Sequence, residues 1–107
     1  MAFDWREFLA LAKTLAGQAG PNYSFEAADR SAVSRAYYAA FCFARNYAEA
    51  SLGFQRTGRA DDHKLLREHL ARQGKIQLAS DLNKLRGWRN ACDYSDQVSN
   101  LNQIVQN

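Results

Sequence analysis

Hydrophobic residues recur every three to four positions along most of the chain, which is the spacing of one face of an α-helix. Asp4 with Glu7 three positions later is an aspartate form of the capping box that begins helices, and Gly17 is a residue type at which helices commonly end. These signals predict a helix over residues 5–17. Its apolar face comprises Trp5, Phe8, Leu9, Ala12, Leu15 and Ala16.

The second segment is apolar on more than one side. One stripe at helical spacing comprises Val33, Ala36, Tyr37, Ala40, Ala44 and Tyr47. The side chains of Tyr38, Phe41 and Phe43 cover other sides of the same turns. A helix that is apolar all round is buried on more than one face. We therefore predict a helix that begins after Ser24 and runs to about Leu52, and that is either the central helix of the domain or half of a subunit interface.

The second half of the chain contains signals for further helices. Asp61 or Asp62 is a favourable N-cap for a helix over residues 61–72. Gly74 interrupts the pattern, and apolar residues return at helical spacing over residues 76–94. A last helix, capped by Ser95 or Asp96, is predicted to carry Val98, Leu101 and Val105. Four to five helices joined by short loops predict an antiparallel bundle.

The composition favours helices over strands throughout the chain. The 107 residues include eighteen alanines, three valines and two isoleucines, whereas β-sheets depend on β-branched residues. The single proline, Pro21, leaves the other segments free to form long helices. The length fits one domain over residues 1–107. We therefore predict an all-α protein, which excludes parallel-sheet nucleotide-binding folds and β-sandwiches.

The apolar runs and the cysteines indicate the cellular setting. The longest uncharged apolar run, Ala36–Ala44, has nine residues, whereas a membrane-spanning helix needs about 20. The start of the chain lacks the basic and apolar pattern of a secretory signal. Cys42 and Cys92 stand fifty positions apart, without the close pairing typical of zinc sites. We therefore expect a cytoplasmic protein with two reduced thiols, no membrane contact, and no metal or other cofactor.

Positive charge is concentrated in the second half of the chain. Residues 1–53 hold five Lys/Arg and five Asp/Glu, so their charges cancel. Residues 54–89 hold nine Lys/Arg and four Asp/Glu, which gives this segment a net charge of +5. Such a basic region attracts phosphate groups or an acidic protein, although a solvated face rich in lysine and arginine gives the same pattern.

The segment over residues 85–94 contains the main candidate binding residues. Arg89 stands one turn after a leucine and interrupts the apolar stripe of its helix. A guanidinium near a buried face needs a partner, and Asp93, one turn later, is the nearest candidate. Arg86 and Asn90 are also one turn apart on this helix. The cluster is therefore either an ion pair that docks helices or part of a binding site.

Two other positions are candidates to face this cluster. Arg35 and Tyr38 lie one turn apart in the second predicted helix, and Arg35 is the last charge before the long apolar run. Arg35 therefore either extends from the core edge into solvent or supplies a second cation. His63 follows two aspartates at a predicted helix start, where a histidine often has no special role.

Taken together, these motifs resemble the HEPN domain family. The matching residues are Arg30 to Phe41, which include Arg-Ala-Tyr-Tyr-Ala, then Asp62-His63-Lys64, and then Leu85 with Arg89-Asn90 and Asp93-Tyr94. The resemblance covers about residues 5–105 and is closest to small stand-alone HEPN proteins. It implies a helical bundle that often dimerises, with a basic cleft shared by two subunits. It also implies a metal-independent endoribonuclease, or a partner of a minimal nucleotidyltransferase in a toxin–antitoxin pair.

The ribonuclease histidine of the HEPN motif is missing from this chain. Ribonuclease members carry a histidine five to seven positions after the arginine, and those positions here hold Tyr94, Ser95 and Asp96. Asp96 also replaces the tyrosine that receives a nucleotide in members paired with a nucleotidyltransferase. Histidine titrates near pH 6.5 and tyrosine near pH 10, and a positioned base contributes roughly 10²–10⁴ in rate. We therefore expect ribonuclease activity to be weak or absent.

The residues support three hypotheses about function. The first is an HEPN-type homodimer that binds RNA or a nucleotide within a toxin–antitoxin or defence module, paired with a nucleotidyltransferase. Its binding residues would be Arg35, Tyr38, Arg86, Arg89 and Asn90, and its candidate catalytic residues Arg89, Asp93 and Tyr94. The second is a non-catalytic protein-interaction partner in which the pair of Arg89 and Asp93 is structural. The third is an active metal-independent endoribonuclease that uses a displaced base.

Overall fold

The computed structural model describes residues 4–18, 20, 24–95, 98 and 101–106, with the side chains of 102, 103 and 106 excepted. Within these residues the chain forms five helices and no β-strand. The helices are α1 (Arg6–Leu15), α2 (Phe25–Ser51), α3 (Asp62–Arg72), α4 (Ile76–Tyr94) and α5 (Leu101–Gln106). The prediction of an all-α helical bundle is confirmed. None of the described helices is both long and apolar enough to cross a membrane.

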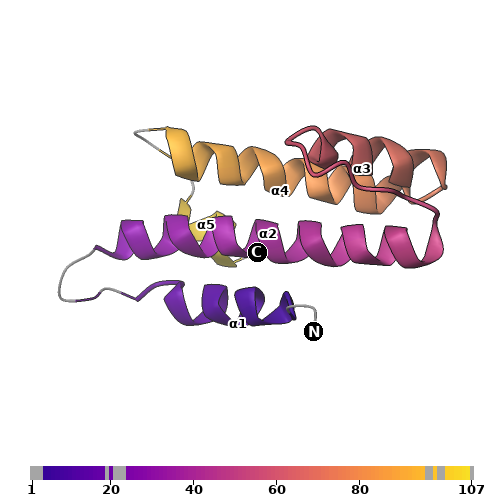
Figure 1. Cartoon of the computed structure of the whole chain (residues 1–107). Coiled ribbons are helices and arrows are strands. Elements are labelled where there is room, and N and C mark those ends of the chain that lie inside the picture. The colour runs from indigo at the N-terminus through magenta and orange to yellow at the C-terminus, as the bar shows by residue number, and fades with distance from the viewer. Residues whose placement is uncertain (1–3, 19, 21–23, 96–97, 99–100, 107) are drawn as a thin grey trace.

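Helix α2 is the central helix of the bundle. Helices α1 and α4 lie on opposite sides of α2 and run antiparallel to it, and α3 packs against α4 beside the C-terminal half of α2 (Figure 1). Helix α5 also contacts α2. The prediction that this apolar helix is buried on more than one face is therefore confirmed. The sequence also allowed this helix to form half of a subunit interface. That alternative applies to the side of α2 that the other helices leave uncovered.

Local sequence signals explain both ends of α2. The Oγ of Ser24 accepts the backbone N–H of Ala27 at 3.1 Å, which caps the helix as the sequence predicts. After the last turn, Gly53 adopts a φ of +73°, a left-handed conformation that glycine tolerates best. The chain then reverses, so that the backbone N–H of Phe54 reaches the carbonyl of Ala48 at 3.2 Å.

The start of α1 differs from the predicted capping box. The carboxylate of Asp4 accepts the backbone N–H of Arg6 at 3.0 Å and pairs with the guanidinium of the same residue at 2.9 Å. The N-cap residue Trp5 makes no side-chain capping bond. The charge of Arg6 therefore draws the carboxylate away from the reciprocal bond with Glu7. Helix α1 accordingly spans Arg6–Leu15, a little shorter than predicted.

The last helix is also shorter than predicted. Ser95 has extended backbone, and its N–H bonds to the carbonyl of Ala91 at 3.0 Å, so it ends α4 rather than beginning the next helix. Asp96, the other predicted cap, lies outside the described residues. Helix α5 begins at Leu101, and Val98 precedes it.

The core lies between α2, α3 and α4. Its largest completely buried side chains are Tyr37, Leu66 and Leu70. Ala48 of α2 and Ala79 of α4 are also buried, and such small residues let helices approach closely. The ring of Tyr37 is therefore fixed in the core, on the side of α2 that faces α3.

Both cysteines are free and buried. Burial is the main reason why the pKa of the Cys42 thiol and the pKa of the Cys92 thiol are raised. A thiol with a raised pKa stays protonated at neutral pH and is a weak nucleophile. The expectation of two unpaired thiols is therefore met in the structure.

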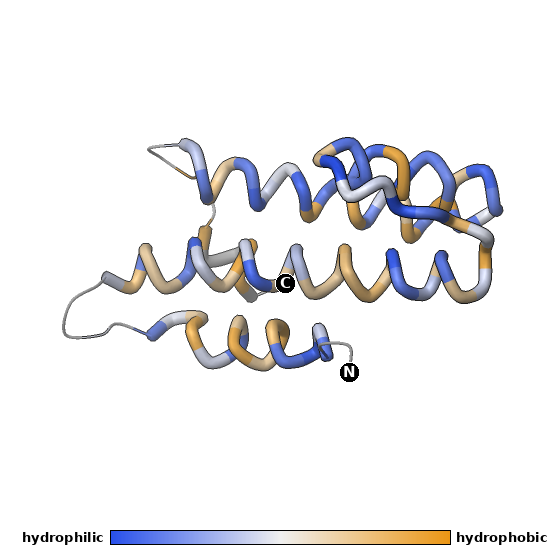
Figure 2. The backbone as a smooth tube through the Cα atoms, viewed as in Figure 1, coloured by the Kyte–Doolittle hydropathy of each residue, from blue (hydrophilic) through white to orange (hydrophobic). Residues whose placement is uncertain are grey.

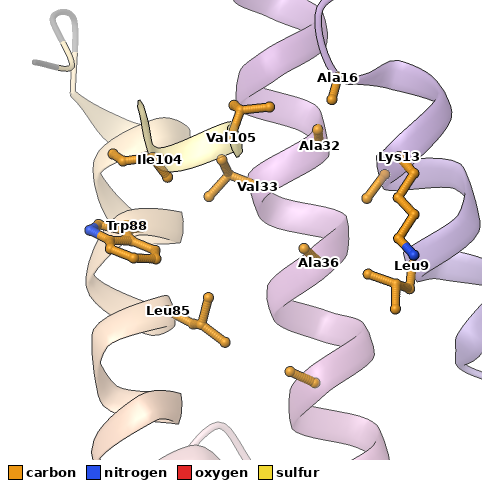
Figure 3. A pocket seen from close by; sticks show the side chains of 12 residues that line it. Leu9, Lys13, Ala16, Ala32, Val33, Ala36, Leu85, Trp88, Ile104 and Val105 are labelled. Carbon is orange, nitrogen blue, oxygen red and sulfur yellow. The ribbon is translucent and has the colours of Figure 1, made fainter. Parts of the chain in front are cut away.

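Apolar and polar residues separate along the bundle. Figure 2 shows hydrophobic positions recurring along α1 and α2, whereas hydrophilic positions predominate on α3 and on the connection that precedes it. An apolar groove of about 540 Å³ follows α2 between α1 and α4, and residues of α5 close one end of it (Figure 3). A second apolar hollow adjoins it, and there Phe43 is 61% exposed. One side of α2 is thus incompletely covered.

Candidate functional site

Arg89 of α4 lies against two tyrosines of α2. Its Nη2 donates a hydrogen bond to the Oη of Tyr38 at 2.5 Å, and its Nη1 donates to the Oδ1 of Asn90 at 2.7 Å. The guanidinium carbon lies 5.1 Å from the ring centre of Tyr38 and 5.5 Å from that of Tyr37. Both distances fall within the range of cation–π attraction. These contacts hold the guanidinium at the boundary between α2 and α4.

Asp93 is the carboxylate next to Arg89, as the spacing predicts. The Nε of Arg89 and the Oδ2 of Asp93 are 3.4 Å apart, and the two side chains are 16% and 30% exposed. The Nε is nevertheless buried without a hydrogen-bond partner among the described residues. Burial tends to lower the pKa of Arg89, but the Tyr38 hydrogen bond and the Asp93 charge raise that pKa above its usual value. The guanidinium thus remains charged and incompletely hydrogen-bonded.

His63 of α3 packs into the same group of aromatic rings. Its ring stacks on Phe41 with the ring centres 3.9 Å apart, and its Nδ1 is hydrogen-bonded to the hydroxyl of Tyr37. Burial lowers the pKa of His63, and the charges of Arg89 and Arg67 lower that pKa further. Burial also raises the pKa of Tyr37. Near neutral pH, the imidazole is therefore uncharged and the phenol is protonated.

The hydrogen bond between Tyr37 and His63 determines the imidazole tautomer. The described residues provide no other acceptor for the buried hydroxyl of Tyr37, so we assign its O–H as the donor to Nδ1. The proton of the neutral ring is then on Nε2. This nitrogen has no hydrogen-bond partner among the described residues and is not completely buried. In this tautomer His63 presents an N–H donor rather than a basic nitrogen.

Arg67 and Arg86 add positive charge beside His63. Arg67 lies one turn after His63 on α3 and donates to its backbone carbonyl at 3.2 Å. Burial lowers the pKa of Arg67, and the positive charge of Arg86 on α4 lowers that pKa further. Arg86 donates to the Oδ1 of Asn83 at 3.2 Å. In the described part of the chain, neither arginine has a carboxylate within ion-pair distance.

We refer to the following group of side chains as the Arg89 site. It comprises Tyr37, Tyr38, His63, Arg67, Arg86, Arg89, Asn90 and Asp93. Three helices, α2, α3 and α4, contribute to it. Neither of the two apolar hollows is lined by any of these residues.

The structure places one of the predicted binding residues elsewhere, and leaves Tyr94 largely exposed. The guanidinium of Arg35 lies over the ring of Phe8 on α1, with its carbon 5.1 Å from the ring centre. Because α1 and α4 lie on opposite sides of α2, Arg35 is not the second cation beside Arg89 (Figure 1). Tyr94 is 77% exposed at the end of α4. Arg67, which the sequence did not single out, is the arginine that contacts His63.

Two sequence signals were available for the part of the site on α3. His63 and Arg67 are four positions apart, so they lie on the same side of a helix, and both fall in the basic stretch over residues 54–89. The sequence does not determine which side of this helix faces α2. The hydrogen bond from His63 to Tyr37 spans 26 positions and depends on how the helices pack.

Among the described residues, no three His, Cys, Asp or Glu side chains gather into a group that could bind a metal ion. Comparisons of the chain with protein-family models, with curated proteins and with solved structures found no match.

The titration of His63 is expected to reduce stability in acid. Its pKa in the folded protein lies below the ordinary value of 6.5, so the unfolded chain binds more protons as the pH falls through 6.5. The free energy of unfolding should therefore decrease as the pH falls from 7, and the loss should be complete below the folded-state pKa. Urea unfolding at several pH values, with His63→Gln as the control, measures the effect. An NMR titration that placed the pKa of His63 above 6.5 would contradict it.

Proposed function

We propose that this protein binds the phosphate groups of RNA or of a nucleotide at the Arg89 site. The supporting observation is an excess of guanidinium groups over carboxylates. Arg67 contacts His63, which is bonded to Tyr37, and Arg89 lies over the ring of the same Tyr37. Arg86 lies one turn before Arg89 on α4, and in the described part of the chain Asp93 is the carboxylate within ion-pair distance of these arginines. Guanidinium groups bind phosphate oxygens with paired, charge-assisted hydrogen bonds.

The aromatic residues of the site favour a nucleotide over a simple anion. The half-buried ring of Tyr38 lies directly beside the guanidinium of Arg89. Aromatic rings and arginine planes both provide stacking surfaces for nucleobases, and they do so for any base. Phosphate contacts and a stacking surface therefore occur side by side, which is the combination that single-stranded RNA and nucleotides need.

The proposed activity is binding rather than cleavage. In its assigned tautomer His63 is a donor, Asp93 faces the guanidinium of Arg89, and Tyr94 is exposed at the helix end. None of these groups is a well-placed base for the 2′-hydroxyl of RNA at neutral pH. The remaining route to an active endoribonuclease is the other tautomer of His63. Robust RNA cleavage in the presence of a metal chelator would favour that alternative.

The HEPN resemblance extends this proposal to the cellular role. The matching motifs support an RNA- or nucleotide-binding member of a toxin–antitoxin or defence module, with a nucleotidyltransferase as partner protein. The reading frame adjacent to the gene tests this role directly. A small nucleotidyltransferase encoded there, and its co-purification with this chain, would support the paired module.

Protein interaction is a second candidate function, and the incompletely covered side of α2 favours it. Phe43 and Tyr47 are exposed there beside Leu9 of α1, in a hollow lined almost entirely by apolar side chains. Large exposed apolar residues that lie together commonly mark an interface. We propose a second copy of this chain as the occupant, related by two-fold symmetry, because the same surface can then cover itself.

Sedimentation analysis should therefore show a dimer. A stable dimer needs an interface of about 1,000 Å² or more. Phe43→Glu is expected to produce a monomer. Phe25→Glu is the matched control, because Phe25 is equally exposed but does not line the hollow. A wild-type monomer at high micromolar concentration would contradict this prediction.

The salt dependence of RNA binding tests the proposed function. Suppose that three arginines each neutralise one phosphate of a single-stranded RNA. The logarithm of the association constant should then fall linearly with the logarithm of the salt concentration, and the slope should be about −2. Fluorescence anisotropy with a labelled single-stranded RNA gives this slope. We expect measurable binding at low salt that weakens steeply as salt is added. A protein that shows no binding at low salt, or the same affinity at all salt concentrations, would contradict the proposal.

A further inference from the structure

We infer that the first turn of α3 is an acid-operated gate over Tyr37 and Phe41, held closed by neutral His63 and opened when that imidazole is protonated. Such a gate acts whether or not the protein binds RNA. Three features of the structure support it: the contacts of His63, the cations around these contacts, and the bond that His69 makes near the other end of the same helix.

In the closed gate, the neutral ring of His63 is the acceptor for a buried donor. The Nδ1 of His63 accepts the O–H of Tyr37, and the imidazole stacks on Phe41 with the two ring planes 12° apart. The ring of Tyr37 is also nearly parallel to the imidazole, at an angle of 17°, and both aromatic side chains are buried. The first turn of α3 is thus held against α2 by contacts that need an unprotonated Nδ1.

Protonation of His63 disrupts this arrangement. A protonated imidazole has two N–H donors and no acceptor. The hydroxyl of Tyr37 can then only accept from Nδ1, and its own O–H is left without an acceptor among the described residues. A buried donor that loses its acceptor is strongly disfavoured. The closed gate therefore favours the neutral ring.

The cations around His63 also oppose its protonation. On α2, the guanidinium carbon of Arg45 lies 5.8 Å from the centre of the phenyl ring on which His63 stacks. On α4, the guanidinium carbon of Arg89 lies 5.5 Å from the centre of the tyrosine ring that is bonded to His63. Arg67 of α3 donates to the carbonyl of His63 itself at 3.2 Å. A charged imidazole would join three guanidinium groups from three helices.

The other titratable groups that face His63 do not offset these cations. The carboxylate of Asp62, the preceding residue, accepts hydrogen bonds from the backbone N–H of Thr57 at 2.9 Å and from its hydroxyl at 2.6 Å. Tyr38, with its ring centre 6.3 Å from that of His63, accepts a hydrogen bond from Arg89. The attraction of Asp62 is outweighed, because burial and then the arginine charges lower the pKa of His63. The closed state therefore loses stability as the pH falls.

His69 holds the last turn of α3 through a bond that acid does not disrupt. Its Nε2 lies 2.6 Å from the backbone carbonyl of Leu52, and a carbonyl can only accept a hydrogen bond. This nitrogen therefore carries a proton whether the ring is neutral or charged. Leu66 and Leu70 of α3 are completely buried in the core. Acid should therefore open the first turn of the helix and leave the rest in place.

Exchange of backbone amide hydrogens with deuterium, followed by NMR at pH 7.5 and pH 5, tests the gate. The N–H of Leu65 bonds to the carbonyl of Asp61 at 2.9 Å and reports the first turn, whereas the N–H of Lys75 bonds to that of Leu70 at 2.8 Å. After correction for intrinsic exchange rates, the protection of Leu65 should fall about tenfold at pH 5, because opening returns one imidazole to its ordinary titration. Protection of Lys75 should change by less than about twofold.

Two variants separate the histidines. His63→Gln removes the titrating group, so the protection of Leu65 should become independent of pH. His69→Gln, which keeps a side-chain N–H donor, should leave the pH effect unchanged. Equal protection of Leu65 at both pH values in the wild type, or an equal loss of protection in all helices, would overturn the inference. The inference would also be overturned by a pH effect that persists in His63→Gln, or by one in the wild type that follows the titration of His69.

Discussion

Replacing Arg89 by alanine is expected to weaken RNA binding by about tenfold to a hundredfold and to lower the free energy of unfolding by about 1–3 kcal/mol. The loss of affinity follows from the removal of a charged donor that lies beside Tyr38. The loss of stability has a separate cause. The carboxylate of Asp93, which is 30% exposed, and the hydroxyl of Tyr38 both lose their guanidinium partner. Anisotropy measures the first effect and urea unfolding the second.

Arg35→Ala is the matched control for this variant. Like Arg89→Ala, this variant removes one positive charge, but it removes that charge from α2, where the guanidinium of Arg35 lies over Phe8 of α1. We expect affinity to change by less than about threefold, which is the effect of net charge alone. Equal losses of affinity in the two variants would show that binding follows the overall charge of the protein and not the Arg89 site.

Leu66→Ala is expected to lower the free energy of unfolding by about 2–5 kcal/mol, which is the usual range for a leucine that leaves a cavity. The side chain of Leu66 is 0% exposed in the core between α2, α3 and α4. Leu65→Ala, at the half-buried neighbouring position, should cost less. Urea unfolding of both variants measures the difference. An effect of Leu66→Ala below about 1 kcal/mol would show that α3 is not firmly packed.

The consequences of Leu66→Ala should extend to the site. Helix α3 also carries His63 and Arg67, so looser packing of this helix lets water reach the imidazole. Because burial is the main cause of the lowered pKa of His63, that pKa should return toward 6.5 in the variant. Stability of the core and chemistry of the site are thus coupled through one helix.

The proposed dimer surface and the Arg89 site occupy different sides of α2. With successive residues turned by about 100°, Tyr37, Tyr38 and Phe41 fall on one side of the helix, and Phe43 and Tyr47 fall on another. The contacts agree, because the first set meets His63 and Arg89 and the second lines an apolar hollow. RNA binding and self-association can therefore occur at the same time, and Phe43→Glu tests the second without touching the first.

The sequence predicted the helices well because their ends depend on local chemistry. Ser24 and Gly53 mark the ends of α2 through contacts within a few positions. The pair of Arg89 and Asp93 was predictable for the same reason, since residues four positions apart in a helix are neighbours. The capping box predicted at Asp4 does not form, because the competing charge of Arg6 lies two positions away and its guanidinium pairs with the Asp4 carboxylate.

The composition of the site was less predictable because it depends on the rotation of each helix about its axis. The bond from Arg89 to Tyr38 spans 51 positions. Arg35 and Tyr38 are one turn apart, yet the first contacts α1 and the second contacts α4. Periodicity places both at the edge of an apolar stripe and does not tell which neighbour each one meets. The sequence leaves the role of His63 open for the same reason.

An NMR titration of the labelled protein with a short 5′-phosphorylated single-stranded RNA tests the central claim most directly. The account predicts that the imidazole signals of His63 and the side-chain Nε–H signals of Arg67, Arg86 and Arg89 shift together and saturate at one RNA concentration. The Nε–H signal of Arg35 should stay unchanged. Shifts confined to Arg35 and α1, or saturable binding that leaves His63 and Arg89 unperturbed, would contradict the assignment of this site.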